Sequence, residues 1–158
     1  MHAAKTKIVS RIVSGGQTGV DRAALDWAIS HGIHHGGWCP QERKAEDGTI
    51  PARYTLTETD SAGYSKRTAW NVRDSDATLI LNMGELDGGT LKTTKLASKM
   101  DKPYLIVQLD DGKDFCISPV RDWLACGQYL TLNVAGPRES KRPGIYAAAL
   151  RFLNHCLC

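Results

Sequence analysis

Residues 14–22 read Ser14-Gly15-Gly16-Gln17-Thr18-Gly19-Val20-Asp21-Arg22 and join an apolar, β-branched run to an amphipathic stretch. The run from Ile8 to Val13 predicts a strand, and the helical spacing of apolar residues predicts a helix from Val20 to Ser30. Glycines at such a junction let backbone N–H groups approach a ligand, and the N-terminus of the following helix attracts anions. The segment therefore predicts a strand-to-helix loop that holds an anionic, phosphate-bearing ligand, with a plain tight turn as the alternative.

Strand and helix patterns alternate along the rest of the chain. Further strands are expected at residues 36–40, 77–81, 104–107 and 129–134, and further helices at 64–74, 90–100, 119–126 and 144–156. The apolar runs at 77–81 and 104–107 are expected to be buried on both faces, which is typical of parallel strands covered by helices. We expect a single α/β domain over residues 1–158, with a Rossmann-like three-layer fold and a mostly parallel sheet of about five or more strands. Residues 1–6 are expected to form a flexible tail.

Three glycine-containing loops, at residues 14–19, 84–90 and 135–138, each follow a predicted strand. Because ligands bind at the carboxyl ends of the strands in such sheets, the three loops are expected to meet at one edge. The second loop places Gly88-Gly89-Thr90 before a helix and so repeats the anion-binding pattern of the first loop. The long polar stretch at 41–60 is expected to be a functional excursion from the fold.

The candidate binding residues come from these loops and from one helix. Arg67 and Asn71 share a face of the helix expected at 64–74. This face is expected to line a ligand, to form an interface or to be an ordinary solvated surface. Lys92 is expected to reach a bound phosphate or to be an ordinary surface lysine. Arg138, Ser140 and Lys141 are expected to form a third anion contact or a plain basic loop. The predicted binding site comprises Gly15, Gly16, Gln17, Thr18, Gly19, Asp21, Arg22, Arg67, Asn71, Gly88, Gly89, Thr90, Arg138 and Ser140.

Composition and charge argue against several other classes of protein. The formal charge of +3 is spread along the chain, without the basic stripe that is typical of nucleic-acid binding. Five cysteines without a CxxC pair favour reduced thiols in a cytoplasmic protein over a disulfide framework or a zinc ribbon. No apolar run approaches the ~20 residues of a membrane span, and no secretory signal is recognised. No metal site is expected among His31, His34 and His35, and Cys39 is expected to be a small buried residue.

Four segments, residues 14–26, 45–54, 67–81 and 88–90, together resemble the molybdenum cofactor carrier family, and the resemblance extends over about residues 8–155. This resemblance implies a Rossmann-like fold related to the lysine-decarboxylase-like, lonely-guy-type proteins, and a homo-oligomer in the form of a tetramer. It also implies binding of the molybdenum cofactor, a pterin with a dithiolene-bound molybdenum and a terminal phosphate. Molybdenum enzymes are then the expected recipients.

The sequence departs from the lonely-guy-type enzymes at their Pro-Gly-Gly-x-Gly-Thr-x-x-Glu motif. Here Asp87 replaces the proline, one glycine is missing, and no glutamate follows Thr90 in the next turn. We therefore expect a carrier that binds and protects the cofactor, without a catalytic residue. A nucleotide-binding or nucleotide-hydrolysing enzyme of the lysine-decarboxylase-like superfamily is the alternative.

Overall fold

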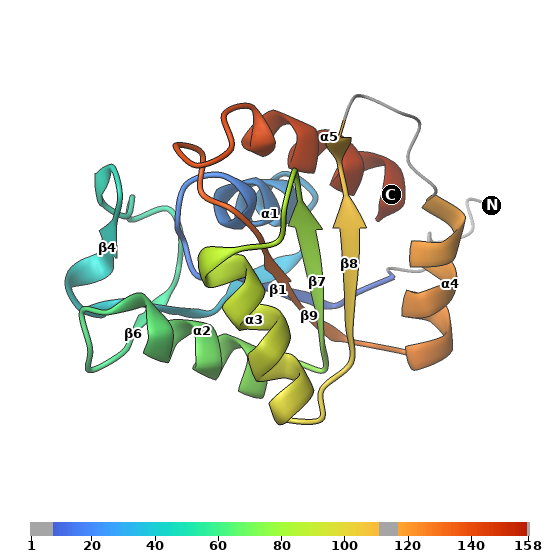
Figure 1. Ribbon diagram of the computed structural model, residues 1–158, viewed down its shortest axis with the longest axis horizontal. Coiled ribbons are helices and arrows are strands. Elements are labelled where there is room, and N and C mark those ends of the chain that lie inside the picture. The colour runs from blue at the N-terminus through green and yellow to red at the C-terminus, as the bar shows by residue number, and fades with distance from the viewer. Residues whose placement is uncertain (1–7, 111–116, 158) are drawn as a thin grey trace.

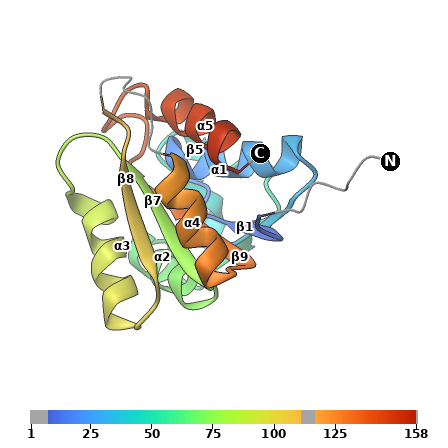
Figure 2. The ribbon, with the colours of Figure 1, turned by 90° about the vertical axis from the view of Figure 1, so that its right-hand side faces the viewer.

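A five-stranded parallel sheet forms the centre of the molecule in the computed structural model (Figures 1 and 2). The structure describes residues 8–110 and 117–157, so the tail expected at residues 1–6 lies outside the described residues. The sheet order is β2-β1-β9-β7-β8, and each neighbouring pair is parallel. These strands are β1 (Arg11–Val13), β2 (His34–Gly36), β7 (Ala77–Asn82), β8 (Tyr104–Gln108) and β9 (Thr131–Ala135).

Helices cover both faces of the sheet, which confirms the expected three-layer α/β architecture (Figure 2). One face carries α1 (Val20–Ser30), α4 (Ile117–Gly127) and α5 (Ile145–Cys156), and the other carries α2 (Tyr64–Arg73) and α3 (Gly88–Lys99). The bounds of α1 are those predicted from its apolar spacing. Helix α3 begins at Gly88, two residues earlier than expected, and therefore includes both glycines of the second loop in its first turn.

The two faces of the sheet differ in polarity. Toward α1, α4 and α5, alternate strand residues such as Leu79, Leu81 and Leu132 are fully buried in the main hydrophobic core. Toward α2 and α3, the sheet buries polar side chains, and Asn133 Nδ2 donates to Thr78 Oγ1 over 3.2 Å. Both residues lie inside strands, so this face of the sheet has a partly polar interior.

Strand β8 lies at the edge of the sheet. The expectation that this strand is buried on both faces is therefore wrong. Tyr104 is 39% exposed and Ile106 is 38% exposed, whereas Leu105 and Val107 pack against the main core. An apolar run of this kind is equally compatible with a central and an edge strand. Its position depends on the order of the strands in the sheet, which local sequence does not encode.

Residues 38–58 form a small layer of short elements beside α1. Strand β3 (Trp38–Cys39) pairs with β6 (Thr57–Glu58), and β4 (Lys44–Ala45) pairs with β5 (Gly48–Thr49) after the 3-10 turn η1 (Gln41–Arg43). The strand expected at 36–40 is divided, because Gly37 adopts a φ of +129° between β2 and β3. A second core fills this layer with Leu25, Cys39, Ala45, Ile50 and Tyr54.

Among the described residues, no helix has both the length and the apolar character that a membrane crossing requires.

The central strands are expected to carry much of the stability. Leu79→Ala should lower the free energy of unfolding by about 2–5 kcal/mol, because Leu79 is fully buried and the cavity cannot collapse easily. Leu130→Ala is the matched control, since Leu130 is 60% exposed, and it should change that free energy by about 0.5 kcal/mol or less. Urea unfolding of both variants measures the difference, and equal losses would contradict this assignment of the core.

Candidate ligand-binding cleft

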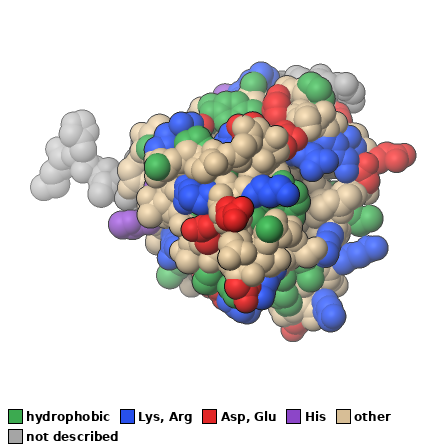
Figure 3. Space-filling view, turned by 90° about the vertical axis from the view of Figure 1, so that its left-hand side faces the viewer, with side chains coloured by type: hydrophobic (Ala, Val, Ile, Leu, Met, Phe, Trp, Pro, Cys, Tyr) green, Lys and Arg blue, Asp and Glu red, His purple; other side chains and the backbone are tan. Residues whose placement is uncertain are grey.

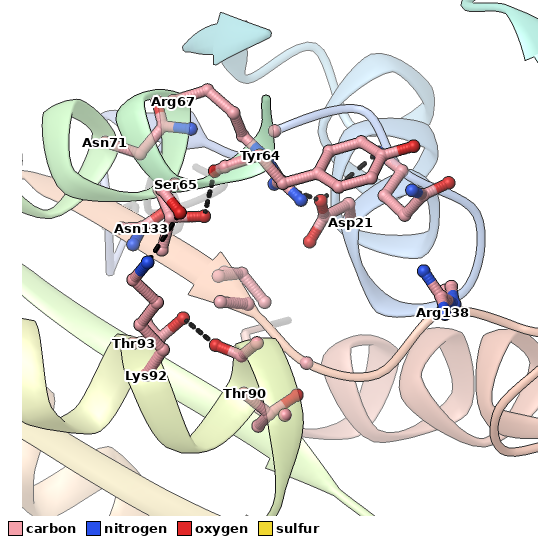
Figure 4. Close-up of a pocket in the computed structure, with 18 of the residues that line it drawn as sticks. Asp21, Tyr64, Ser65, Arg67, Asn71, Thr90, Lys92, Thr93, Asn133 and Arg138 are labelled. Atoms are coloured by element: carbon pink, nitrogen blue, oxygen red, sulfur yellow. Dashed lines mark hydrogen bonds and ion pairs between the residues drawn. The ribbon is translucent and has the colours of Figure 1, made fainter. Parts of the chain in front are cut away.

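A cleft of about 290 Å³ opens at the carboxyl ends of β1 and β9, between α2 and α3 (Figure 4). Strand β9 lies between β1 and β7, with Asn133 in register with both Val13 and Thr78, so the loops after these strands meet there. All three predicted glycine-containing loops contribute to the cleft. The predicted residues that line it are Gly15, Gln17, Asp21, Arg67, Asn71, Gly88, Gly89, Thr90 and Arg138.

Cations predominate among the charged side chains that line the cleft. Arg67, Lys92, Arg138 and Lys141 contribute positive charge, and Asp21 is the acidic residue among the described lining. Arg138 and Lys141 also pair with carboxylates outside the lining. A cleft with this balance of charge attracts an anionic ligand.

The N-terminus of α3 is open toward the cleft. The first turn of a helix leaves N–H groups without intrahelical partners, and no acidic residue occupies the first turn of α3. A Cβ added to Gly89 would meet no atom within 4 Å, whereas one added to Gly88 would lie 2.4 Å from Lys141 Nζ. The geometry therefore combines free backbone donors, the positive end of a helix and an ammonium group, which suits a phosphate.

Lys92 and Ser65 connect the two helices that border the cleft. Lys92 Nζ donates to Ser65 Oγ over 2.5 Å and so joins α3 to α2 (Figure 4). Lys92 follows Gly88-Gly89 by about one helical turn, and its side chain lines the same cleft. An anion bound there would have Lys92 within the same lining.

The first loop differs from the second because it is hydrogen-bonded within itself. The N–H of Gln17 donates to Asp21 Oδ2 over 3.2 Å, and the N–H of Thr18 donates to Gln17 Oε1 over 3.0 Å. The N–H of Val20 donates to the carbonyl of Pro137 over 3.3 Å. Several donors expected to face an anion are thus already used in holding the loop.

Gly16 and Gly19 lie outside the cleft lining. A Cβ on Gly16 would be 2.7 Å from Leu56 Cδ1, on the side of the second core, and a Cβ on Gly19 would be 2.4 Å from the carbonyl of Pro137. Both glycines have positive φ, +82° and +80°. Their requirement for glycine is therefore explained by backbone conformation and close packing.

Asp21 and Arg67 form a largely buried ion pair inside the cleft. Arg67 Nη1 donates to Asp21 Oδ2 over 3.0 Å, and the side chains are 15% and 5% exposed respectively. Burial raises the pKa of Asp21 above its ordinary value and outweighs the opposing effect of the Arg67 charge. The Arg67 guanidinium also lies 5.5 Å from the centre of the Tyr64 ring, so the pair has an aromatic wall beside it.

The hairpin of β4 and β5 holds the first and third loops together. Glu46 accepts hydrogen bonds from the Thr18 hydroxyl and from Ser140 Oγ, and it lies 3.4 Å from Arg138 Nε. Asp47 accepts two hydrogen bonds from Arg22, at 2.5 Å and 2.7 Å. Thr18, Arg22 and Ser140 are therefore engaged by the hairpin and lie outside the cleft lining. The face that carries the hairpin accordingly mixes basic and acidic side chains (Figure 3).

Asn71 lines the cleft, but its side-chain amide is committed to the backbone. Its Oδ1 accepts from the N–H of Trp38 over 2.7 Å, and its Nδ2 donates to the carbonyl of Trp38 over 2.9 Å. The contribution of Asn71 is therefore to attach α2 to β3.

Several lining residues were absent from the predicted site. They are polar or aromatic side chains from α2, α3, β9 and the loop before α5: Tyr64, Ser65, Thr68, Lys92, Thr93, Asn133 and Lys141. A signal existed for Asn133, which interrupts the apolar run of a strand near its carboxyl end. Tyr64 had no comparable signal, because its position depends on where α2 packs.

Metal ligands do not gather in the described part of the chain. No group of three His, Cys, Asp or Glu side chains there has a geometry that could hold a metal ion. His35 Nε2 instead accepts from the N–H of Thr55 over 3.1 Å, and Cys39 is buried in the second core.

Gly15 is expected to be required for the Asp21–Arg67 pair. Gly15→Ala would place a Cβ 1.8 Å from Arg67 Nη1, so the guanidinium must move away and the free energy of unfolding should fall by about 1–3 kcal/mol. Gly89→Ala is the control, since its Cβ would meet no atom within 4 Å. Urea unfolding compares the two variants. A Gly15→Ala variant as stable as Gly89→Ala would show that Arg67 is not held in this position.

The hairpin contact is expected to depend on pH. Partial burial raises the pKa of Glu46, but the hydrogen bonds from Ser140 and Thr18 outweigh it and the pKa falls below the ordinary 4.5. A lowered pKa means that this contribution to stability is complete above pH 4.5 and is lost as the pH falls through the lower value.

Glu46→Gln should therefore reduce stability at pH 7 by about 1 kcal/mol and flatten the loss on acidification. Urea unfolding between pH 3 and pH 7 measures both effects. Ser140→Ala removes one donor to Glu46 and should flatten the same slope in part. An unchanged slope in Glu46→Gln would exclude Glu46 as its source.

The sequence and the fold were compared with those of known proteins. No match was found among curated proteins. The crystal structure of the putative molybdenum carrier protein from Syntrophus aciditrophicus SB, at 1.45 Å resolution, is similar with a TM-score of 0.91 and 44% sequence identity, over 96% of this chain and 97% of that one. The model of the circularly permutated YpsA SLOG family matches residues 12–157, which include every element that lines the cleft. The chain belongs to the circularly permutated YpsA SLOG family.

Proposed function

We propose that this protein binds the molybdenum cofactor in the cleft, protects it and carries it to molybdenum enzymes. The observation that carries the proposal is the open N-terminus of α3, which faces a cleft lined by four cationic side chains. The name of the protein from Syntrophus aciditrophicus SB, which is 44% identical, supports the same ligand.

The terminal phosphate of the cofactor fits the first turn of α3. Gly89 leaves room for an anion to reach the backbone N–H groups, and Lys141 Nζ lies over Gly88. Lys141 is held by Asp87, at 2.8 Å, so its ammonium is already in position. A phosphate can therefore be bound by pre-positioned donors with little loss of side-chain entropy.

The pterin ring fits between Tyr64 and the floor of the cleft. That floor is the end of β9, where Val134, Ala135 and Gly136 present backbone and small side chains. An aromatic wall and a small-residue floor suit a flat ring system, and they restrict its access to oxidants in solution.

The carrier role agrees with the departure from the lonely-guy-type motif after Thr90. The nucleotide-hydrolysing alternative is favoured by one observation, the buried Asp21 carboxyl inside an anion-binding cleft. Burial raises the pKa of Asp21, which is a property of many catalytic acids and bases. Release of base or phosphate from nucleoside mono- and diphosphates, abolished by Asp21→Asn, would establish this alternative.

Binding should weaken when the α3 subsite is altered. Lys92→Gln should raise the Kd for the cofactor about tenfold through the loss of one charge, and Gly89→Val should raise it more, because its side chain enters the cleft. Lys95→Gln is the matched control, since Lys95 is exposed on the same helix but lies outside the lining.

The measurement is anaerobic titration with cofactor released from a molybdenum enzyme, followed by transfer to cofactor-free nitrate reductase. Wild-type protein and Lys95→Gln should bind, delay oxidation and restore activity, whereas Gly89→Val should not. No binding by the wild type, or equal binding by Gly89→Val, would refute the proposal.

The expected homo-oligomer belongs to the same proposal. A tetramer would present several clefts to a recipient enzyme. Light scattering of the cofactor-free and cofactor-bound protein determines the assembly state.

A further inference from the structure

The Asp21–Arg67 pair is incompletely hydrogen-bonded for a group so deep in the protein. Asp21 is 4% exposed, its contacts with Gln17 and Arg67 both reach Oδ2, and the Ser14 side chain is a further hydrogen-bond partner of the carboxylate. Arg67 Nε is buried and has no hydrogen-bond partner in the described part of the chain. Buried polar groups are normally satisfied, so unused capacity at a cleft wall indicates a ligand contact.

The second carboxylate oxygen of Asp21 is turned into the cleft, beside Tyr64 and opposite the end of α3 (Figure 4). Its position offers an acceptor to whatever occupies this end of the cleft. Because the carboxylate is held by Arg67 and by the N–H of Gln17, it stays in one orientation.

Gln17 adds a donor next to this acceptor. Its Oε1 accepts from the N–H groups of Thr18 and Glu46, at 3.0 Å and 2.9 Å. These two hydrogen bonds fix the orientation of the side-chain amide and leave Nε2 as its remaining donor. No hydrogen bond of its Nε2 is found among the described residues, although the side chain is 7% exposed and lines the cleft. The end of the cleft thus presents an anionic acceptor and an amide donor side by side.

We propose that Asp21 and Gln17 recognise the 2-amino-4-oxopyrimidine edge that pterins and guanine share. This edge presents two adjacent N–H donors, the amino group and the ring N–H, followed by a carbonyl acceptor. Asp21 accepts from the two donors, and Gln17 Nε2 donates to the carbonyl. Tyr64 stacks on the ring, while the phosphate is held at the first turn of α3. The proposal rests on the proposed function, since it assigns the second half of the same cleft.

The arrangement selects against related rings. Hypoxanthine lacks the 2-amino group, so one N–H to the carboxylate is lost. Adenine places a ring nitrogen acceptor where the carboxylate needs a donor, and an amino group where Gln17 needs an acceptor. The ring edge therefore determines the ligand, whereas the phosphate contact is common to all nucleotides.

Calorimetric titration of the full chain with GMP, IMP and AMP tests this assignment, because the three share ribose and phosphate. Wild-type protein should bind GMP about tenfold more tightly than IMP and about 100-fold more tightly than AMP. A parallel arm compares 6-hydroxymethylpterin phosphate with its lumazine counterpart, in which oxygen replaces the 2-amino group. The ligand class that binds with the higher affinity, GMP or 6-hydroxymethylpterin phosphate, shows whether the cleft prefers a guanine or a pterin ring.

Two variants assign the discrimination to these side chains. Asp21→Asn should reduce the GMP-to-IMP ratio to about one and leave IMP binding within about threefold of the wild type. Gln17→Glu retains Oε1 as an acceptor and replaces the Nε2 donor by oxygen, so it should shift preference from GMP toward AMP. Circular dichroism confirms folding, and Gln17→Glu provides the test if Asp21→Asn does not fold.

Equal affinities for the three nucleotides together with equal affinities for the two ring analogues would overturn the proposal. Unchanged discrimination in both variants, or no binding of GMP and of the pterin phosphate, would also overturn it. Discrimination without transfer of molybdenum cofactor would retain this subsite and reject the carrier function. Transfer of the cofactor without discrimination between the rings would support the carrier function and reject this subsite.

Discussion

The parallel pairing of β1, β9 and β7 is the constraint on which the cleft depends. Because the three strands run in the same direction, their following loops must emerge at the same edge of the sheet. Strand β9 separates β1 from β7, so its end forms a floor and the neighbouring loops form the walls. Gly136 allows this close approach, since a Cβ there would lie 2.2 Å from the carbonyl of Leu81. Residues separated by more than a hundred positions are thereby brought into one lining.

The contrast between the two faces of the sheet explains where a ligand can enter. One face is sealed by apolar side chains from three helices, and their packing supplies the stability of the fold. The other face lies under α2 and α3 and buries the polar side chains of Thr78, Asn82 and Asn133, of which Asn133 lines the cleft. The main hydrophobic core and the proposed binding cleft therefore lie on opposite faces of one sheet.

Local sequence predicted the elements well but not their relative positions. The spacing of apolar residues predicted helix α1. The three loops were predicted to meet because the carboxyl ends of parallel strands lie at the same edge of a sheet. The edge position of β8 and the orientation of Gly16 toward Leu56 depend on packing between distant segments. The self-contained hydrogen bonding of the first loop depends on the Gln17 and Asp21 side chains. A glycine-rich pattern alone cannot distinguish such a loop from the open turn at Gly88-Gly89.

The hairpin that carries Glu46 and Asp47 has a consequence for how fast a ligand can be captured. Its carboxylates connect the first loop to the third, so both loops are ordered when the chain folds. A cleft that is ordered in advance spares the entropy that a closing loop would lose on binding. For the proposed ligand, the association rate would then be set by diffusion and by the positive field of the cleft, and the dissociation rate by the number of contacts in the cleft.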